Sequence, residues 1–194
     1  MQIVGYHGTT HAIADQLASG TFPFRLSSNL GDWLGRGIYF WQDAPERAAV
    51  WAKRGGLKID EIAVIKASID LEGCLDLFDL QTYRELRQVY PQFLALEQSR
   101  GYSWHQSELL VQAGRASFAG ASSERSDILN YRDRALIDWY VEFLRSEGVI
   151  IRSVRGVFLY GTAIFRQSFL FNWSHSQIAV IDSAAISNIE RIEV

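Results

Sequence analysis

The chain has 194 residues, of which 48% are hydrophobic and 21% charged, a length and composition typical of one globular domain. Its net charge of −3 excludes a global cationic field for nucleic acid but allows a local basic patch. A lone cysteine, Cys74, excludes an intramolecular disulfide and a cysteine metal cluster. Because the sequence has no leader pattern and no apolar run of membrane-spanning length, we expect a cytoplasmic protein without a membrane partner.

Strands and helices alternate in the first part of the chain. Residues 3–6 (IVGY) predict a short buried strand, and residues 10–20 predict a helix. Residues 36–41 (RGIYFW) predict a second strand because they are aromatic and β-branched. The clearest helix is predicted over 43–56, and a strong strand over 62–71.

Residues suited to helix ends support the two predicted helices. Thr10 is a suitable N-cap for the first helix. For the second, we expect Asp43 as the N-cap of a capping box, Pro45 in the first turn and Gly55 at the end.

The pattern becomes helical after the third predicted strand. Residues 81–148 carry apolar side chains at spacings of three and four, which predicts a helical insertion. Strand patterns return at 156–160 and 177–182. Strands at both ends with helices between them predict an α+β fold, in a single domain spanning residues 1–194.

Three short motifs contain the residues suited to chemistry. The glycines of LGDWLGRGIYF (30–40) precede a strand, so they are no dinucleotide fingerprint. They either let a ligand approach the backbone or form a tight turn into a core strand. His7 and His11 are four residues apart, but Gly8 lies between them and no acidic or cysteine partner is near, so we expect no metal site.

The polar residues of NWSHSQIAVID (172–182) stand immediately before a predicted buried strand. They either face a cleft or form an ordinary junction between a loop and a strand.

Together, these motifs resemble the ADP-ribosyltransferase family. The similarity is to its diphtheria-toxin and poly(ADP-ribose) polymerase branch, which has a His-Tyr-Glu triad on three strands. His7-Gly8 matches the first motif, and residues 35–40 match the second, Gly-x-Gly-Ile-Tyr-Phe. The third motif is a Glu that opens a strand, and Gln177 stands at that position here. The resemblance implies a fold of two packed β-sheets with flanking helices.

The resemblance also implies a function. We expect a mono-ADP-ribosyltransferase, a glycosyltransferase that uses NAD as a substrate, of the toxin or effector type found in prokaryotes and phages. Besides NAD, the implied partners are a macromolecular acceptor (protein, RNA or DNA) and a neutralising antitoxin. Two alternatives stay open because of Gln177: a degenerate module that binds NAD or ADP-ribose, and an NAD glycohydrolase toxin.

The site residues follow from the matched motifs. The expected catalytic residues are His7, Tyr39, Gln177 and His175. The expected cofactor-binding residues are His7, Gly8, Thr9, Arg36, Gly37, Tyr39 and Trp51, with Arg25 as an alternative contact for the pyrophosphate. In this scheme the backbone N–H and C=O of Gly8 contact the nicotinamide carboxamide, and Tyr39 and Trp51 stack on nicotinamide. The side chain of Gln177 faces the NAD-binding cleft.

Overall fold

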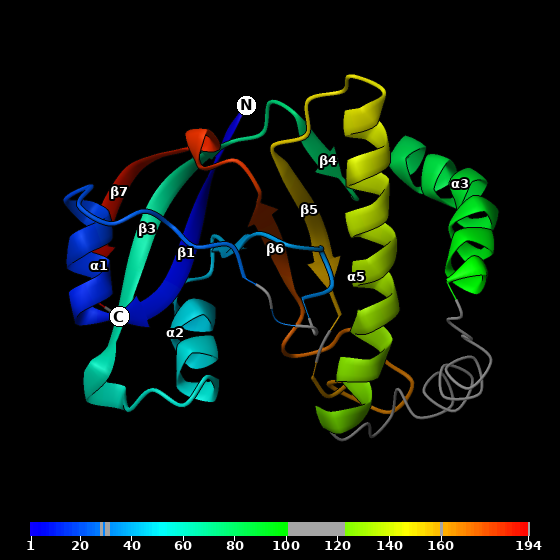
Figure 1. Ribbon diagram of the computed structural model, residues 1–194. Coiled ribbons are helices and arrows are strands. Elements are labelled where there is room, and N and C mark those ends of the chain that lie inside the picture. The colour runs from blue at the N-terminus through cyan, green and yellow to red at the C-terminus, as the bar shows by residue number, and fades with distance from the viewer. Residues whose placement is uncertain (28, 30–31, 101–122, 160, 194) are drawn as a thin grey trace.

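The computed structural model describes residues 1–27, 29, 32–100, 123–159 and 161–193, with the backbone alone for 123–130. Within these residues it contains seven strands and four helices (Figure 1). The strands are β1 (Gln2–Thr10), β2 (Ile38–Gln42), β3 (Ile62–Asp70), β4 (Cys74–Asp76), β5 (Ser153–Phe158), β6 (His175–Val180) and β7 (Ile186–Ile192). The helices are α1 (His11–Ala18), α2 (Pro45–Arg54), α3 (Leu80–Ser99) and α5 (Ser123–Ser146). None of the helices in the described ranges is long and apolar enough to cross a bilayer.

The strands form one mixed sheet in the order β4-β5-β6-β2-β1-β3-β7. The β4–β5 pair is parallel, and the other neighbouring strands pair antiparallel. This arrangement confirms the predicted α+β class.

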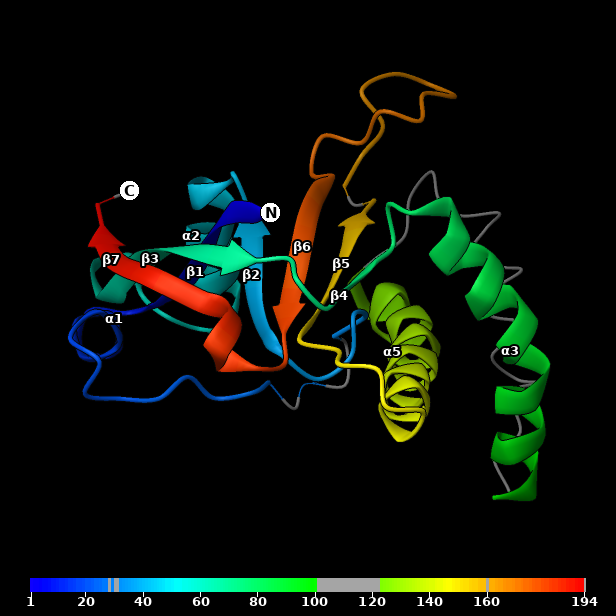
Figure 2. The same ribbon diagram turned by 90° about the horizontal axis from the view of Figure 1, so that it is seen from above.

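The expectation of two packed sheets is wrong, because a short contact makes the sheet continuous. β1 pairs with β3 along its whole length but with β2 through two residue pairs, Gly5–Gln42 and Tyr6–Trp41. Since β2 also pairs with β6, this contact joins β7-β3-β1 to β2-β6-β5-β4. Figure 2 shows the strands of the two groups running in clearly different directions.

Side chains of β2 enter three hydrophobic clusters. Phe40 is buried with Leu17 of α1 in the first cluster. Tyr39, next along the strand, joins a second cluster with residues of α5. Trp41 packs with Ala48 of α2 in a third. Because successive side chains of a strand point to opposite faces, β2 is covered by helices on both faces.

The predicted helical insertion corresponds to α3 and α5, and the rest of it, residues 101–122, lies outside the described part of the chain. α5 packs on the sheet through Ile137, Tyr140 and Val141. α3 packs on α5, with the rings of Phe93 and Trp139 5.7 Å apart. The insertion therefore adds a helical layer beside the strands.

The first strand is longer than predicted. The sequence predicts an end at Tyr6, but the strand pairs with β3 as far as Thr10, opposite Ile62. The His-Gly-Thr-Thr segment lacks the apolar alternation that marks a strand, so its extended form depends on pairing with β3. As predicted, Thr10 caps α1, accepting a hydrogen bond from the N–H of Ile13 at 3.4 Å.

The predicted N-cap of α2 is wrong. Asp43 adopts a left-handed conformation with φ of 52° and donates its N–H to the carbonyl of Val4 at 3.2 Å. The N-cap is Ala44, whose side chain makes no capping bond. Pro45 does begin the helix, and Gly55 does end it.

Candidate active site

β1 and β2 separate directly after the Tyr6–Trp41 pair, which creates a gap in the sheet. The N–H of Asp43 donates to the carbonyl of Val4, so the polar backbone groups of Val4 point toward β2. Backbone groups of a strand alternate between its two edges, so those of Gly8 point the same way. Gly8 therefore turns its N–H and C=O toward the edge where β2 no longer pairs. These are the groups that the resemblance assigns to the nicotinamide carboxamide.

Gly8 also lies directly beneath α2. A Cβ atom at this position would lie 2.1 Å from the carbonyl oxygen of Ala48, a backbone atom. Only glycine fits here without moving the helix, whatever binds in the gap.

The ring of His7 bridges the two diverging strands. Its Nδ1 lies 2.8 Å from the carbonyl oxygen of Tyr39, and because a carbonyl only accepts, Nδ1 carries the proton. Burial lowers the pKa of His7, and the bond to Tyr39 opposes this shift. At neutral pH the ring is therefore uncharged, and Nε2 has a lone pair that can accept a hydrogen bond. The ring packs against Phe24 and Phe40, with centroids 6.5 and 5.7 Å away.

Tyr39 is less accessible than the resemblance implies. Its side chain is only 9% exposed and belongs to the cluster with α5. Its hydroxyl donates to the carbonyl of Gly35 at 2.9 Å and accepts from the N–H of Leu34 at 3.0 Å. Burial raises the pKa of this hydroxyl, so it stays protonated. These two hydrogen bonds hold the Tyr39 side chain against the Leu34–Gly35 segment. The ring therefore has little exposed area on which nicotinamide could stack.

The glycines before β2 serve packing. Gly35 has a φ of 83°, a conformation that favours glycine, and a Cβ there would lie 2.5 Å from Asp138 Oδ1. A Cβ on Gly37 would lie 2.8 Å from the Cβ of Ala179 on β6. The motif predicts either a close approach of a ligand to the backbone or a tight turn into a core strand. The tight turn accounts for both glycines, and Gly37 is covered by β6.

Three other predicted cofactor residues have roles in the fold. Thr9 is buried in β1. The backbone N–H of Arg36 donates to Asp138 Oδ1 at 2.7 Å, and its side chain is exposed. The guanidinium of Arg25 lies 5.0 Å from the ring centroid of Phe22.

Gln177 is buried beneath Trp33, a residue that none of the matched motif positions includes. Its side chain is 4% exposed, and its Oε1 accepts a hydrogen bond of 2.6 Å from Trp33 Nε1. The indole fits against β5 because residue 156 is a glycine. A Cβ atom at this position would lie 2.6 Å from Trp33 Cη2 and would clash with the ring. Phe158 packs against the same indole at 5.4 Å. The expectation that Gln177 faces an open cleft is therefore wrong.

The available signal for Trp33 was its place in the motif. It stands two residues before Gly35, within the glycine-containing segment that precedes β2. Because an indole N–H only donates, its contact also determines which end of the Gln177 amide points toward it.

His175 opens β6 and has one nitrogen free. Its Nδ1 donates to the carbonyl of Trp173 at 2.6 Å, so the neutral ring has its lone pair on Nε2. Nε2 is buried and has no hydrogen-bond partner among the described residues. Burial lowers the pKa of His175, the bond to Trp173 raises it, and the charge of Arg47 lowers it further. A neutral imidazole with a free Nε2 is suited to accept a proton.

Aromatic and cationic side chains, among them the buried Trp41, adjoin His175. The ring of Trp41 lies 6.4 Å from His175 and 5.6 Å from Trp51, whose side chain is 49% exposed on α2. The guanidinium of Arg47 lies 4.6 Å from the Trp173 ring and donates to the carbonyl of Asn172 at 2.8 Å. The Trp51 ring is therefore partly exposed to solvent, and its stacking on nicotinamide stays a prediction.

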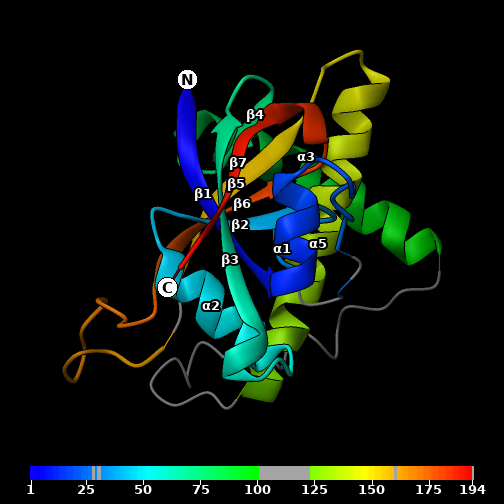
Figure 3. The same ribbon diagram turned by 90° about the vertical axis from the view of Figure 1, so that its left-hand side faces the viewer.

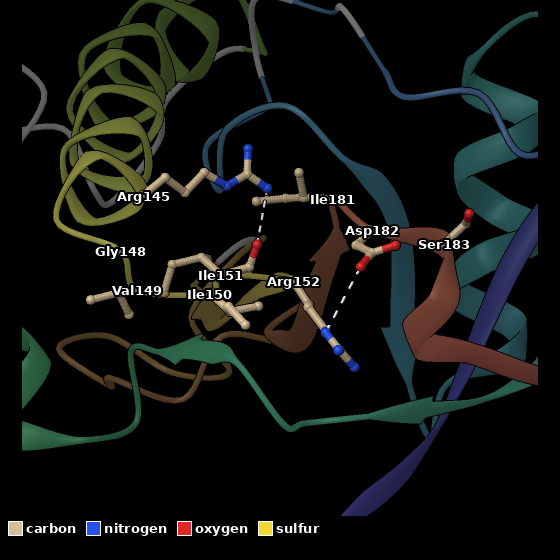
Figure 4. Close-up of a pocket in the computed structure, with 9 residues that line it drawn as sticks. All are labelled: Arg145, Gly148, Val149, Ile150, Ile151, Arg152, Ile181, Asp182 and Ser183. Atoms are coloured by element: carbon tan, nitrogen blue, oxygen red, sulfur yellow. Dashed lines mark hydrogen bonds and ion pairs between the residues drawn. The ribbon is translucent and has the colours of Figure 1, made fainter.

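A surface pocket lies at the other end of β6 (Figure 4). Its lining residues are Arg145, Gly148, Val149, Ile150, Ile151, Arg152, Ile181, Asp182 and Ser183. Its charged groups already have partners. Arg145 donates to the carbonyl of Ile151 at 2.9 Å, and Arg152 lies 3.8 Å from Asp182. We therefore assign no ligand to it.

The chain matches no family model, no curated protein and no solved structure. Across the described ranges, no group of three or more His, Cys, Asp or Glu side chains is arranged to hold a metal ion. The candidate site is therefore defined by the residues around the β1–β2 gap.

Proposed function

We propose that this chain is an NAD-dependent mono-ADP-ribosyltransferase. The observation that supports it most is the meeting of three distant motifs in neighbouring strands β1, β2 and β6. His7 of β1 contacts Tyr39 of β2 directly. Gln177 of β6 lies opposite Trp41, the residue of β2 at which the pairing with β1 ends.

The reaction breaks the bond between the nicotinamide nitrogen and C1′ of the ribose. Nicotinamide leaves with the electron pair, and the transition state resembles an oxocarbenium ion. A nucleophile of the acceptor forms the new bond to C1′ and loses its proton. His175 Nε2 takes that proton in our scheme, because it has a free lone pair, once a shift of the neighbouring side chains brings this buried nitrogen into contact with the acceptor.

Two side chains would orient the ribose. His7 Nε2 would accept a hydrogen bond from one ribose hydroxyl. Gln177 Oε1 would accept one from the 2′-hydroxyl with the lone pair that Trp33 does not use, after the indole that covers it moves aside. A neutral amide gives a weaker bond than a carboxylate, roughly half as strong, so we expect slower turnover than with Glu.

The Trp33–Gln177 bond favours a second candidate, a domain that binds NAD or ADP-ribose without chemistry. The indole covers Gln177, and an N–H donor draws electron density away from the amide oxygen. Both effects weaken the stabilisation of positive charge on the ribose.

Incubation with NAD labelled on the adenylate phosphate separates these candidates. Free nicotinamide is measured with and without cell lysate, and the labelled product is digested with nuclease or protease. Nicotinamide release that requires lysate, with label retained in a macromolecule, supports transfer. Equal release without lysate indicates hydrolysis by water, and NAD binding without release indicates the binding domain.

Two variants test the assigned roles. His175→Ala and Gln177→Ala should lower turnover with little change in NAD affinity, since their bonds strengthen mainly in the transition state. Full turnover at saturating NAD in both variants would contradict the site assignment.

A further inference from the structure

The loop between β5 and β6, residues 161–174, is built as a hairpin by its own hydrogen bonds. The N–H of Ile164 donates to the carbonyl of Leu170 at 3.1 Å, and Ala163 forms a β-bridge with Phe171. The N–H of Ser168 donates to the carbonyl of Phe165 at 3.0 Å, which closes the tip. Figures 2 and 3 show this segment projecting well beyond the sheet.

Aromatic side chains at the tip of this loop face solvent. Phe165 is 62% exposed and Phe169 is 89% exposed, although the backbone around them is well paired. Ile164 and Leu170 beside them are also exposed. Large apolar side chains gathered on an ordered projection are typical of an interaction surface.

The charge of this region is opposite to that of the whole chain. The chain has 22 acidic and 19 basic residues, yet residues 149–181 contain no Asp or Glu. The same stretch contains Arg152, Arg155 and Arg166, the last of which is exposed at the tip. Arg152 and Arg155 are paired with Asp182 and Asp76, which leaves Arg166 as the exposed positive charge at the tip of the loop.

Arginines and an aromatic ring also lie at the base of the loop, next to the candidate site. The guanidinium groups of Arg47 and Arg54 lie 4.6 and 5.8 Å from the ring centroid of Trp173 at the base of the loop. Trp173 is followed two residues later by His175, whose Nε2 is buried and without a hydrogen-bond partner in the described structure. Aromatic rings and guanidinium groups thus occur both at the tip of the loop and at its base, beside His175.

We propose that this surface binds a single-stranded nucleic acid and that the acceptor of ADP-ribose is a nucleotide of that strand. This inference rests on the proposed function. Bases stack on exposed aromatic rings, while arginines contact the phosphates between them. A protein partner held by apolar contacts alone would not account for the lack of Asp and Glu in residues 149–181.

The proposed acceptor defines the atoms that react in the transfer step. A nitrogen of one base attacks C1′ of the nicotinamide ribose, nicotinamide leaves with the electron pair, and the proton of that nitrogen passes to His175 Nε2. A single strand needs no duplex opening, because its bases are not paired with a second strand.

Binding is tested first without NAD, by fluorescence anisotropy of labelled 12-nucleotide single-stranded RNA, single-stranded DNA and duplex DNA with the full chain. We expect single strands to bind more tightly than the duplex. Phe165→Ala and Phe169→Ala should each weaken binding about 5- to 150-fold, the usual range for loss of one stacked base. Arg166→Gln should reduce the slope of log K against log salt by about 0.7 if it contacts one phosphate.

Tyr83→Ala is the matched control, because Tyr83 is also an exposed aromatic residue but lies on α3. It should bind single strands as the wild type does. Absence of oligonucleotide binding, or equal affinity in the wild type and both Phe variants, overturns the proposal.

The labelled-NAD experiment distinguishes this failure from failure of the proposed function. Label that survives nuclease but not protease would leave the transferase intact and refute a nucleic-acid acceptor. Oligonucleotide binding that depends on Phe165 and Phe169, without any consumption of NAD, would refute the transferase and leave the binding surface.

Discussion

The hydrogen bond between Trp33 and Gln177 gives the sharpest stability prediction. Trp33→Phe keeps an aromatic ring but removes the N–H that donates to Gln177 Oε1 at 2.6 Å. Because Gln177 is 4% exposed, water cannot readily replace the lost donor. A buried acceptor without a partner costs about 1–3 kcal/mol, so the free energy of unfolding should fall by this amount.

A double-mutant cycle with Gln177→Leu isolates the bond from the change in ring size. Gln177→Leu alone leaves the indole N–H of Trp33 unpaired, whereas the double variant removes both polar partners. Replacing both partners by apolar groups is nearly neutral, so the double variant should be more stable than the sum of the single changes predicts. We expect a coupling energy of about 1 kcal/mol or more.

Urea denaturation at pH 7, followed by far-ultraviolet circular dichroism, measures all four proteins without depending on tryptophan fluorescence. Strictly additive changes, or a Trp33→Phe variant as stable as the wild type, would refute the reasoning. Either result would mean that the indole does not bond to Gln177 in solution.

Three further predictions concern packing and pH. Gly156→Ala should destabilise the fold by about 1–3 kcal/mol, because its Cβ would lie 2.6 Å from Trp33, and urea titration measures this. Gly8→Ala should cost at least as much in the same assay, since Ala48 presents a backbone oxygen at 2.1 Å; an unchanged midpoint would refute the close contact. The stability advantage of the wild type over His175→Gln should shrink from pH 7 to pH 5. Burial lowers the pKa of His175, so the unfolded chain takes up a proton first; a pH-independent difference would contradict this.

The sequence by itself determined the elements that depend on local signals. Pro45 and Gly55 mark the ends of α2, and the structure has the helix between them. The apolar run at 62–71 predicts β3, observed at Ile62–Asp70. These signals act within a few residues, through fixed φ of proline, the freedom of glycine and the period of apolar side chains.

The tertiary structure alone decided how the distant motifs meet. The extension of β1 to Thr10 comes from pairing with β3, and the single sheet comes from two residue pairs between β1 and β2. The cover over Gln177 comes from Trp33, 144 positions earlier. Such contacts follow from the order and register of the strands in the sheet. The apolar periodicity of one segment does not specify this order, because each strand pairing also depends on the surface of the partner segment.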